Sequence, residues 1–210
     1  GWENVAAGQT RLDDEHVGLY WTRVGEKNGY LDAVVMQSRY DGSSTSLRGL
    51  GVDLDGKGTT ASLEVGKPLL RFGQSAWWLE PQLQVIWQRT DIDDTADAVS
   101  AVRMQNDNAW TGRAGFRLAA DYTLADNGWQ PYLKVNYWRG FSGEDRIDIG
   151  GDPLPSEQAY RALEVGVGVV ARFNANVSAF AVADYTRDLE SDAQKERKVV
   201  EGNIGLRYDF

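Results

Sequence analysis

Very few side chains in this chain of 210 residues have the types and spacing that catalysis requires. The single histidine, His16, follows Asp13, Asp14 and Glu15 directly. A histidine beside a carboxylate can transfer protons in general acid–base catalysis. The same residues also fit a group of solvated charges in a surface loop, and we favour that interpretation. We therefore predict no catalytic residue and no enzymatic activity.

A second cluster consists of the carboxylates Asp91, Asp93, Asp94 and Asp97. It could bind Ca²⁺, since hard cations prefer oxygen ligands. Its spacing does not match an EF-hand loop, however, and the Glu that closes such a loop is missing. A solvated acidic loop explains the cluster better than a metal site does.

The composition excludes several other kinds of site and partner. The chain has no Cys and one His, so thiolate and multi-histidine metal centres are excluded, and we expect no cofactor. Its net charge of −9 argues against nucleic-acid binding, which requires a basic surface. The chain contains no run of about 18 apolar residues, so no transmembrane helix is predicted. Its first residues do not resemble a signal peptide.

Hydrophobicity alternates along the chain with a period of two, which is typical of strands that present two different faces. The C-terminal residues show this most clearly. One row is apolar or glycine and ends in two aromatics: Val200, Gly202, Ile204, Leu206, Tyr208 and Phe210. The other row is polar, charged or glycine: Glu201, Asn203, Gly205, Arg207 and Asp209. The same alternation predicts about nine strands, within residues 17–22, 31–40, 60–66, 77–88, 110–122, 129–138, 163–173, 177–187 and 200–210.

The connections between these strands alternate between short and long. The short ones are rich in Gly and Asn and lie at 25–28, 70–76, 124–127 and 174–176. The long ones lie at 41–58, 90–108, 142–158 and 189–198. Several strands also reach the 9–11 residues that cross a bilayer when tilted. Short turns on one rim and long loops on the other are typical of outer-membrane β-barrels.

The two predicted faces fit a membrane barrel better than a soluble one. Aromatic residues bracket the apolar rows, as Trp77 and Trp87 or Trp129 and Tyr137 do, which is expected at the two lipid–water interfaces. The opposite rows carry many charges, which a dry core would not tolerate but a hydrated lumen would. We therefore predict an all-β fold, an antiparallel transmembrane β-barrel of the outer-membrane type. A soluble β-sandwich or a lipocalin-like barrel is the alternative fold.

Stretches spread over nearly the whole chain resemble the β-barrel translocator domain of type V autotransporters of Gram-negative bacteria. Each stretch is a weak signal alone, but their order and spacing together are specific. They are VGLYWT (17–22), GYLDAVV (29–35), ASLEVG (61–66), WLEPQLQ (78–84), GRAGFRL (112–118), PYLKVN (131–136) and GLRYDF (205–210).

The resemblance implies a twelve-stranded barrel with a helix in its pore, of which this chain holds about the last nine strands. Residues 1–210 would form one translocator domain that lacks its first strands and the pore helix. Residues 1–16 would then hold the end of an earlier strand and an external loop.

The resemblance further implies an outer-membrane anchor that supports export of an N-terminal passenger to the cell surface. Its partners would be outer-membrane lipid and lipopolysaccharide, the barrel-assembly machinery, its own passenger and its pore helix. The C-terminus would be periplasmic and the long loops extracellular.

Two groups of residues are the candidate site. We expect six charged residues to face the lumen, although each could instead pair with its neighbours across the wall: Glu64, Glu80, Arg113, Arg117, Glu164 and Arg207. The apolar row at the C-terminus resembles the assembly signal of outer-membrane proteins: Ile204, Leu206, Tyr208 and Phe210. An ordinary lipid-facing strand that ends at an interfacial aromatic explains the same row, and the two interpretations are compatible.

Two other functions stay open at this stage. A different outer-membrane barrel, such as a porin or a membrane-embedded hydrolase, would show the same strands. A membrane hydrolase would place a Ser/His/Asp set near one rim, for which the sequence offers one His. A soluble β-sandwich that acts as a binding module is the third candidate.

Overall fold

The computed structural model describes residues 9–45, 51–73, 75–96, 101–105, 108–124, 127–142, 144–149, 152–157, 160–189 and 198–208. Almost all of them lie in two antiparallel sheets. Within these ranges, no helix has the length and apolar character needed to cross a membrane.

The main sheet follows the chain in order, so each long strand pairs with the next long strand. It confirms the predicted all-β antiparallel fold and the predicted nine strands along one path. The strands are β1 (Gln9–Val24), β2 (Tyr30–Thr45), β4 (Gly56–Gly66), β6 (Trp77–Ile92), β9 (Asn108–Ala120), β11 (Asn127–Ser142), β14 (Arg161–Arg172), β15 (Val177–Asp188) and β16 (Lys198–Tyr208). Three short strands extend it at its rims: β3 (Gly51–Asp53), β5 (Leu70–Arg71) and β10 (Tyr122–Leu124).

Strand β1 corrects the expectation that the first 16 residues hold a loop. It begins at Gln9 and pairs with β2 without a break from Gln9 opposite Thr45 to Val24 opposite Tyr30. The charged stretch around His16 therefore lies within a strand. The strand was not predicted here because the apolar residues do not alternate. It forms because pairing with β2 overrides local propensity.

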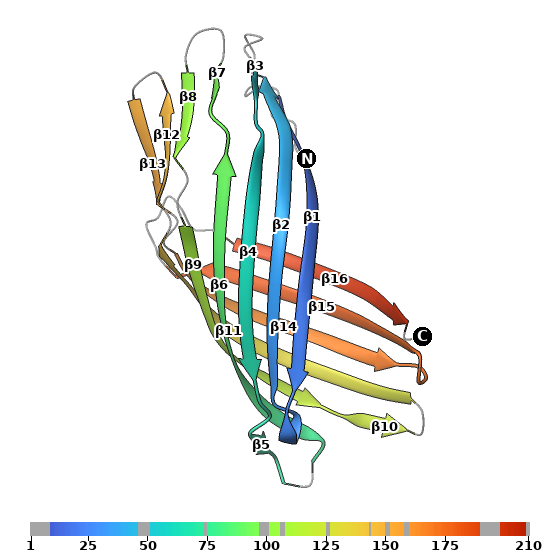
Figure 1. Cartoon of the computed structure of the whole chain (residues 1–210). Helices are drawn as coiled ribbons and strands as arrows, with labels where there is room; N and C mark the ends of the chain where they lie inside the picture. Colours follow the sequence, from blue (N-terminus) through green and yellow to red (C-terminus); the bar gives the residue numbers. More distant parts are fainter. Residues whose placement is uncertain are drawn as a thin grey trace.

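The connections alternate as predicted. Short turns join the strands at one end of the sheet, here called the short-turn end, and the 3₁₀ turn η1 (Glu26–Asn28) is one of them. The opposite end is the long-loop end. Two of the long connections were predicted as loops but contain strands, which form a separate four-stranded sheet. It consists of β7 (Thr95–Ala96), β8 (Ala101–Gln105), β12 (Glu144–Ile149) and β13 (Asp152–Glu157), and it projects beyond the main sheet in Figure 1.

The main sheet curls strongly, so that β14, β15 and β16 pass behind β1 to β6 in Figure 1. Because side chains alternate along each strand, every strand gives one row to each face of the curl. The polar rows share one face and the apolar rows share the other. In the strand order, β1 and β16 are the two ends of the sheet and do not pair with each other.

Candidate functional site

The polar face carries a connected set of ion pairs and hydrogen bonds. Its centre is Arg113 on β9, whose side chain is only 9% exposed. Arg113 Nη2 lies 2.8 Å from Oε2 of Glu64 on β4, although β6 separates the two strands. Arg113 Nε also donates to Oε1 of Gln84 on β6 at 2.9 Å. Contacts across an intervening strand require converging side chains, so this face is the concave, inner face of the curl.

Glu64 connects Arg113 to a polar group nearer the short-turn end. The Tyr30 hydroxyl on β2 donates to Oε1 of Glu64 at 2.6 Å. Nε2 of Gln82 on β6 donates to the Tyr30 oxygen at 2.9 Å and to Oε1 of Glu80 at 2.8 Å. Glu80 and Gln82 are both buried. Buried polar groups of this kind stay favourable only when they are hydrogen-bonded, as these are.

A second group of charges lies on β11, β14 and β15. The Lys134 ammonium is 2.9 Å from Oε1 of Glu164 and 3.0 Å from Oδ2 of Asp184. Glu164 also accepts from Nδ2 of Asn136 at 2.9 Å and from Nε1 of Trp138 at 2.8 Å. One cation thus neutralises parts of two carboxylates, and two neutral donors saturate Glu164.

A hydrogen bond from Arg113 to Asn136 joins the two groups, with 3.2 Å between Nη1 and Oδ1. The result is one polar network that extends across the inner face from β2 to β15, which we call the inner polar network. Two buried carboxylate oxygens near it, Asp32 Oδ1 and Asp184 Oδ1, accept no hydrogen bond from the described residues.

The structure brings together four of the six residues predicted to face the lumen: Glu64, Glu80, Arg113 and Glu164 belong to the inner polar network. Arg117 lies directly opposite Glu80 in the strand register, and its side chain makes other contacts. Its guanidinium carbon is 4.3 Å from the centre of the Tyr132 ring, and Nη2 donates to Gln130 Oε1 at 3.1 Å. Arg207 lies on β16, opposite Ser178.

Sequence reasoning missed the amide side chains that connect the charges. The period-two rows that hold the predicted charges also hold Gln82, Gln84 and Asn136. Position in these rows was therefore the signal that could have identified the three amides as part of the site. Asn136 is 1% exposed, and no charge marks it as part of a site.

The opposite face is apolar and exposed. Leu83, Phe116, Leu133 and Val167 on four different strands keep between 47% and 59% of their surface accessible. Large aromatic side chains lie toward its ends, including Trp129 at the short-turn end (60% exposed) and Trp110 nearer the long-loop end (45%). An exposed apolar face of this extent fits contact with lipid rather than with water.

His16 forms a hydrogen-bonded chain that sequence reasoning did not foresee. Its Nδ1 lies 2.8 Å from the Ser38 hydroxyl oxygen, and its Nε2 pairs with an Asp14 carboxylate oxygen. The set has the composition of a hydrolase triad, but Ser38 lies within a strand that pairs on both sides. Its neighbouring backbone N–H groups therefore serve the sheet and cannot form an oxyanion hole.

One carboxylate of the second acidic cluster binds a cation of the chain itself. Asp91 accepts from Arg89 through both carboxylate oxygens, at 2.9 to 3.1 Å. The Asp93 N–H donates to the Asp55 carbonyl oxygen at 2.8 Å. Asp97 lies outside the described residues. Within the part of the chain that is described, no group of His, Asp or Glu has metal-site geometry.

The C-terminal row lies on β16, at the edge of the sheet. Ile204 and Leu206 are 87% and 81% exposed, and Tyr208 belongs to the same row. Phe210 lies outside the described residues. This row is therefore presented on the apolar face of β16, which pairs only with β15 among the described strands.

Sequence comparison relates the chain to autotransporters. A family model described as the autotransporter beta-domain matches residues 3–184. The pertactin autotransporter of Bordetella bronchiseptica is 28% identical over 195 residues, which cover 89% of this chain and 21% of that protein. The probable autotransporter YcgV of Escherichia coli is 26% identical over 216 residues, which cover 99% of this chain and 22% of that protein. The chain spans about a fifth of the length of these relatives.

Solved structures agree with the sequence comparison. The β domain of the Bordetella autotransporter BrkA matches with a TM-score of 0.77 and 26% identity, over 98% of this chain and 77% of that one. The transport unit of the Escherichia coli autotransporter AIDA-I matches with a TM-score of 0.75 and 20% identity, over 96% and 67% of the two chains, and supports the fold. The chain therefore belongs to the autotransporter β-domain family, whose β-barrels are outer-membrane translocators.

Proposed function

We propose that this chain anchors a longer protein in the outer membrane and supports export of that protein's own N-terminal passenger. The opposite polarity of the two faces is the observation that carries the proposal. The outer face offers apolar side chains to lipid, and the concave face offers a hydrated, hydrogen-bonding wall to a polypeptide in transit. Glu64, Glu80, Arg113, Arg117, Glu164 and Arg207 line that wall in this proposal.

The proposed barrel contains more strands than the main sheet described here. Strands β1 and β16 end the strand order, and an open sheet edge in lipid leaves backbone groups unsatisfied at a cost of several kcal/mol each. We assign residues 1–210 to one translocator domain whose closure needs further strands of the same protein. A pore helix could supply donors to the unused oxygens of Asp32 and Asp184.

The proposed orientation places the long-loop end outside the cell and the C-terminus in the periplasm. Short periplasmic turns and longer external loops are the rule for outer-membrane barrels. The edge of β16, with Ile204, Leu206 and Tyr208, would be recognised by the barrel-assembly machinery through strand addition, and the terminal Phe210 would complete the signal. Outer-membrane lipid and lipopolysaccharide would surround the outer face.

The proposal includes no enzymatic activity for this domain. The family match favours a translocator over a porin or a membrane-embedded hydrolase. The Ser38–His16–Asp14 chain lacks oxyanion donors, as described above, and no cofactor is needed.

Because the chain has no Cys, single cysteines test the orientation cleanly. Full-length protein with Asp53→Cys (long-loop end) should react with a membrane-impermeant maleimide on intact cells. The matched variant Glu26→Cys (short-turn end) should react only after the outer membrane is opened. Surface exposure of the passenger on the same cells, read by added protease, tests export. The reverse labelling pattern, or a passenger that stays protected in cells with correctly labelled barrels, would contradict the proposal.

A further inference from the structure

A small pocket lies on the outer face at the short-turn end, where the turn between β1 and β2 meets the end of β4. Its volume is about 280 Å³. Three charged residues line it: Arg23 near the end of β1, Glu26 in the turn η1, and Lys67, which directly follows β4. Arg23 lies opposite Leu31, and Leu31 lies opposite Val65, so these three share one cross-strand row of the outer face. The pocket therefore places charges at the margin of the apolar face.

The three charges of this pocket have no partner in the part of the chain that the structure describes. Arg23, Glu26 and Lys67 take part in no ion pair and no side-chain hydrogen bond among those residues. All three residues are exposed. Two cations and one carboxylate beside one pocket are therefore available to a ligand that carries both a negative and a positive group.

The backbone around the pocket is tightly constrained. The Gly25 N–H donates to the Gly29 carbonyl oxygen at 2.7 Å and closes the turn. Inside this turn, Lys27 and Asn28 have φ angles of 59° and 61°, a left-handed conformation that costs free energy in residues other than glycine and that is often found at ligand sites. A Cβ at Gly29 would lie 3.4 Å from Cγ of Lys67, so the stem of Lys67 packs on the turn. The turn and the packed lysine thus bring charges from two hairpins to one place.

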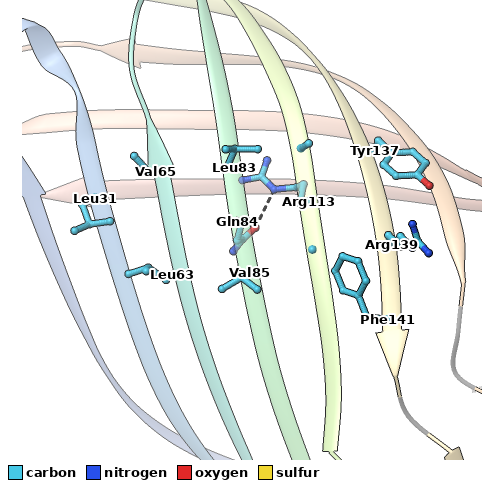
Figure 2. Close-up of a pocket in the computed structure, with 12 residues that line it drawn as sticks. Leu31, Leu63, Val65, Leu83, Gln84, Val85, Arg113, Tyr137, Arg139 and Phe141 are labelled. Atoms are coloured by element: carbon cyan, nitrogen blue, oxygen red, sulfur yellow. Dashed lines mark hydrogen bonds between the residues drawn. The ribbon is translucent and has the colours of Figure 1, made fainter.

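An apolar groove continues from the pocket along the outer face. Its volume is about 520 Å³, and Leu31 and Val65 line both the pocket and the groove. The small residues Gly112 and Ala114 of β9 leave space in its middle. Figure 2 shows the other apolar side chains that line it: Leu63, Leu83, Val85, Tyr137 and Phe141. The charged pocket and the apolar groove therefore form one continuous depression.

The groove has the length and direction that an acyl chain requires. It crosses the sheet from β2 to β11, which is four strand spacings or about 19 Å. It begins at Leu31, close to the short-turn end of β2, and reaches Phe141, close to the long-loop end of β11. The groove thus leads from one interface into the hydrocarbon core, of which each leaflet is about 15 Å thick. Its course suits an extended acyl chain whose headgroup occupies the pocket.

We propose that the pocket and the groove bind one phosphatidylethanolamine molecule of the periplasmic leaflet. The lipid phosphate contacts Arg23 and Lys67, and its primary ammonium donates to the Glu26 carboxylate, both through charge-assisted hydrogen bonds. One acyl chain lies in the groove. Charge selects this lipid, because a headgroup without an ammonium would leave Glu26 facing a phosphate of the same sign. The inference rests on the proposed function, in which the outer face meets lipid and the short-turn end is periplasmic, and it adds one defined headgroup site.

The first test needs no variant and uses the full-length protein in detergent. Native mass spectrometry measures the dissociation constants of three lipids with the same acyl chains. Phosphatidylglycerol has the phosphate but no ammonium, and phosphatidylcholine has a quaternary ammonium without N–H donors. We expect phosphatidylethanolamine to bind about tenfold more tightly than either, since only its ammonium can donate to Glu26. Equal affinity for the three lipids, as in a non-specific lipid shell, would overturn the proposal.

The second test removes the charges of the pocket one at a time, with folding checked by heat-modifiable gel migration. Glu26→Gln should weaken phosphatidylethanolamine binding about tenfold and leave phosphatidylglycerol binding within about twofold. Its control, Asp121→Asn, changes an exposed acid at another short turn and should leave both affinities within about twofold. A Glu26→Gln protein that keeps its full preference for phosphatidylethanolamine would refute the role of the carboxylate and with it the choice of lipid.

Lys67→Gln should instead weaken the binding of phosphatidylethanolamine and phosphatidylglycerol alike, by about fivefold, because both lipids carry the phosphate. Its control, Arg71→Gln, removes an exposed base in β5 of the same hairpin, outside the lining of the pocket. Equal weakening by Lys67→Gln and Arg71→Gln would mean that the rim attracts phosphate without a defined site, and the proposal would fail.

The groove is tested with glycerophosphoethanolamine, which has the same headgroup but no acyl chains. At a concentration equal to that of the lipid, it should not displace phosphatidylethanolamine from the unmodified protein. Displacement at that concentration would show that the groove contributes nothing. The cysteine labelling described above tests the orientation independently, so outside labelling at Asp53→Cys together with equal affinity for the three lipids would refute only this site.

Discussion

Arg113 and Glu64 form an ion pair of 2.8 Å across the width of an intervening strand. The side chain of Arg113 is 9% exposed and that of Glu64 is 22% exposed, so solvent screens the pair weakly. Gln84, which the register places between them on β6, accepts from the same guanidinium. The contact therefore fixes β4, β6 and β9 relative to one another.

Removing one charge of this pair should destabilise the barrel strongly. We expect Arg113→Met to lower the free energy of unfolding by about 3 kcal/mol, because Glu64 would remain as a largely buried charge, 22% exposed, with weaker partners. The double variant Arg113→Met with Glu64→Gln should lose clearly less than the sum of the two single losses. Urea titration of the detergent-refolded protein, followed by Trp fluorescence, measures each value. Additive losses would show that the two residues act independently.

Gly168 leaves the space that the Tyr132 ring occupies. The two residues are directly opposite, and a Cβ at Gly168 would overlap the ring, on which Arg117 packs at 4.3 Å. We expect Gly168→Ala to cost about 1–3 kcal/mol, the usual range for overpacking. Gly202→Ala is the matched control, because its Cβ would meet only the Val182 carbonyl oxygen at 3.9 Å.

The thermal midpoint of the heat-modifiable gel shift measures both glycine variants. The Gly202→Ala midpoint should stay within about 2 °C of the unmodified protein or rise slightly, since alanine reduces the entropy of the unfolded chain. Adding Tyr132→Ala to Gly168→Ala should remove most of the overlap and recover part of the loss. A similar midpoint for both single glycine variants would contradict the packing argument.

Ser38 should be chemically inert despite its contact with His16. Its backbone neighbours are engaged in pairing with β1 and β4, so no donors are placed to stabilise an oxyanion. We expect a fluorophosphonate probe to leave the folded protein unlabelled, with the same background as Ser38→Ala. Labelling of the unmodified protein that disappears in Ser38→Ala and in His16→Ala would reveal a hydrolase.

Phe210 should act in assembly more than in stability. We expect its deletion from the full-length protein to slow outer-membrane assembly several-fold, because strand recognition reads alternate side chains at an exposed edge. The thermal midpoint of barrels that do assemble should shift by only a few degrees, since an assembly signal acts before the barrel is complete. Pulse-chase labelling with the gel shift gives both quantities. Equal assembly rates with and without Phe210 would refute the signal role.

Most of the sheet could be predicted because lipid and lumen impose opposite polarity on alternate residues. Val165, Val167 and Val169 against Glu164, Gly166 and Gly168 make a strand visible without any homologue. The start of β1 could not be predicted in this way, because Asp13 to His16 carry polarity on both faces and only pairing with β2 reveals the strand. Strands β8 and β12 could not be predicted for a similar reason. They pair with each other, and the paired residues lie far apart in the sequence.

The sequence indicated which charged residues are candidates for the site, but not which hydrogen bonds and ion pairs connect them. Row position grouped Glu64, Arg113 and Glu164, and in the structure the three belong to one hydrogen-bonded network. It could not show that Arg113 contacts Glu64 in addition to its direct cross-strand neighbour Gln84, because the contact past β6 depends on the curvature of the sheet. The amide of Asn136, which joins the two charged groups, carries no sequence signal of its own.

The bonds that skip a strand also have a mechanical meaning. Tyr30 reaches Gln82 past β4, Arg113 reaches Glu64 past β6, and Lys134 reaches Asp184 past β14. Each such bond is a chord across the arc of the sheet, and flattening the arc would lengthen every chord at once. The radius of curvature is thus set by short polar tethers on the inside, and a widening of the wall would have to break them one after another.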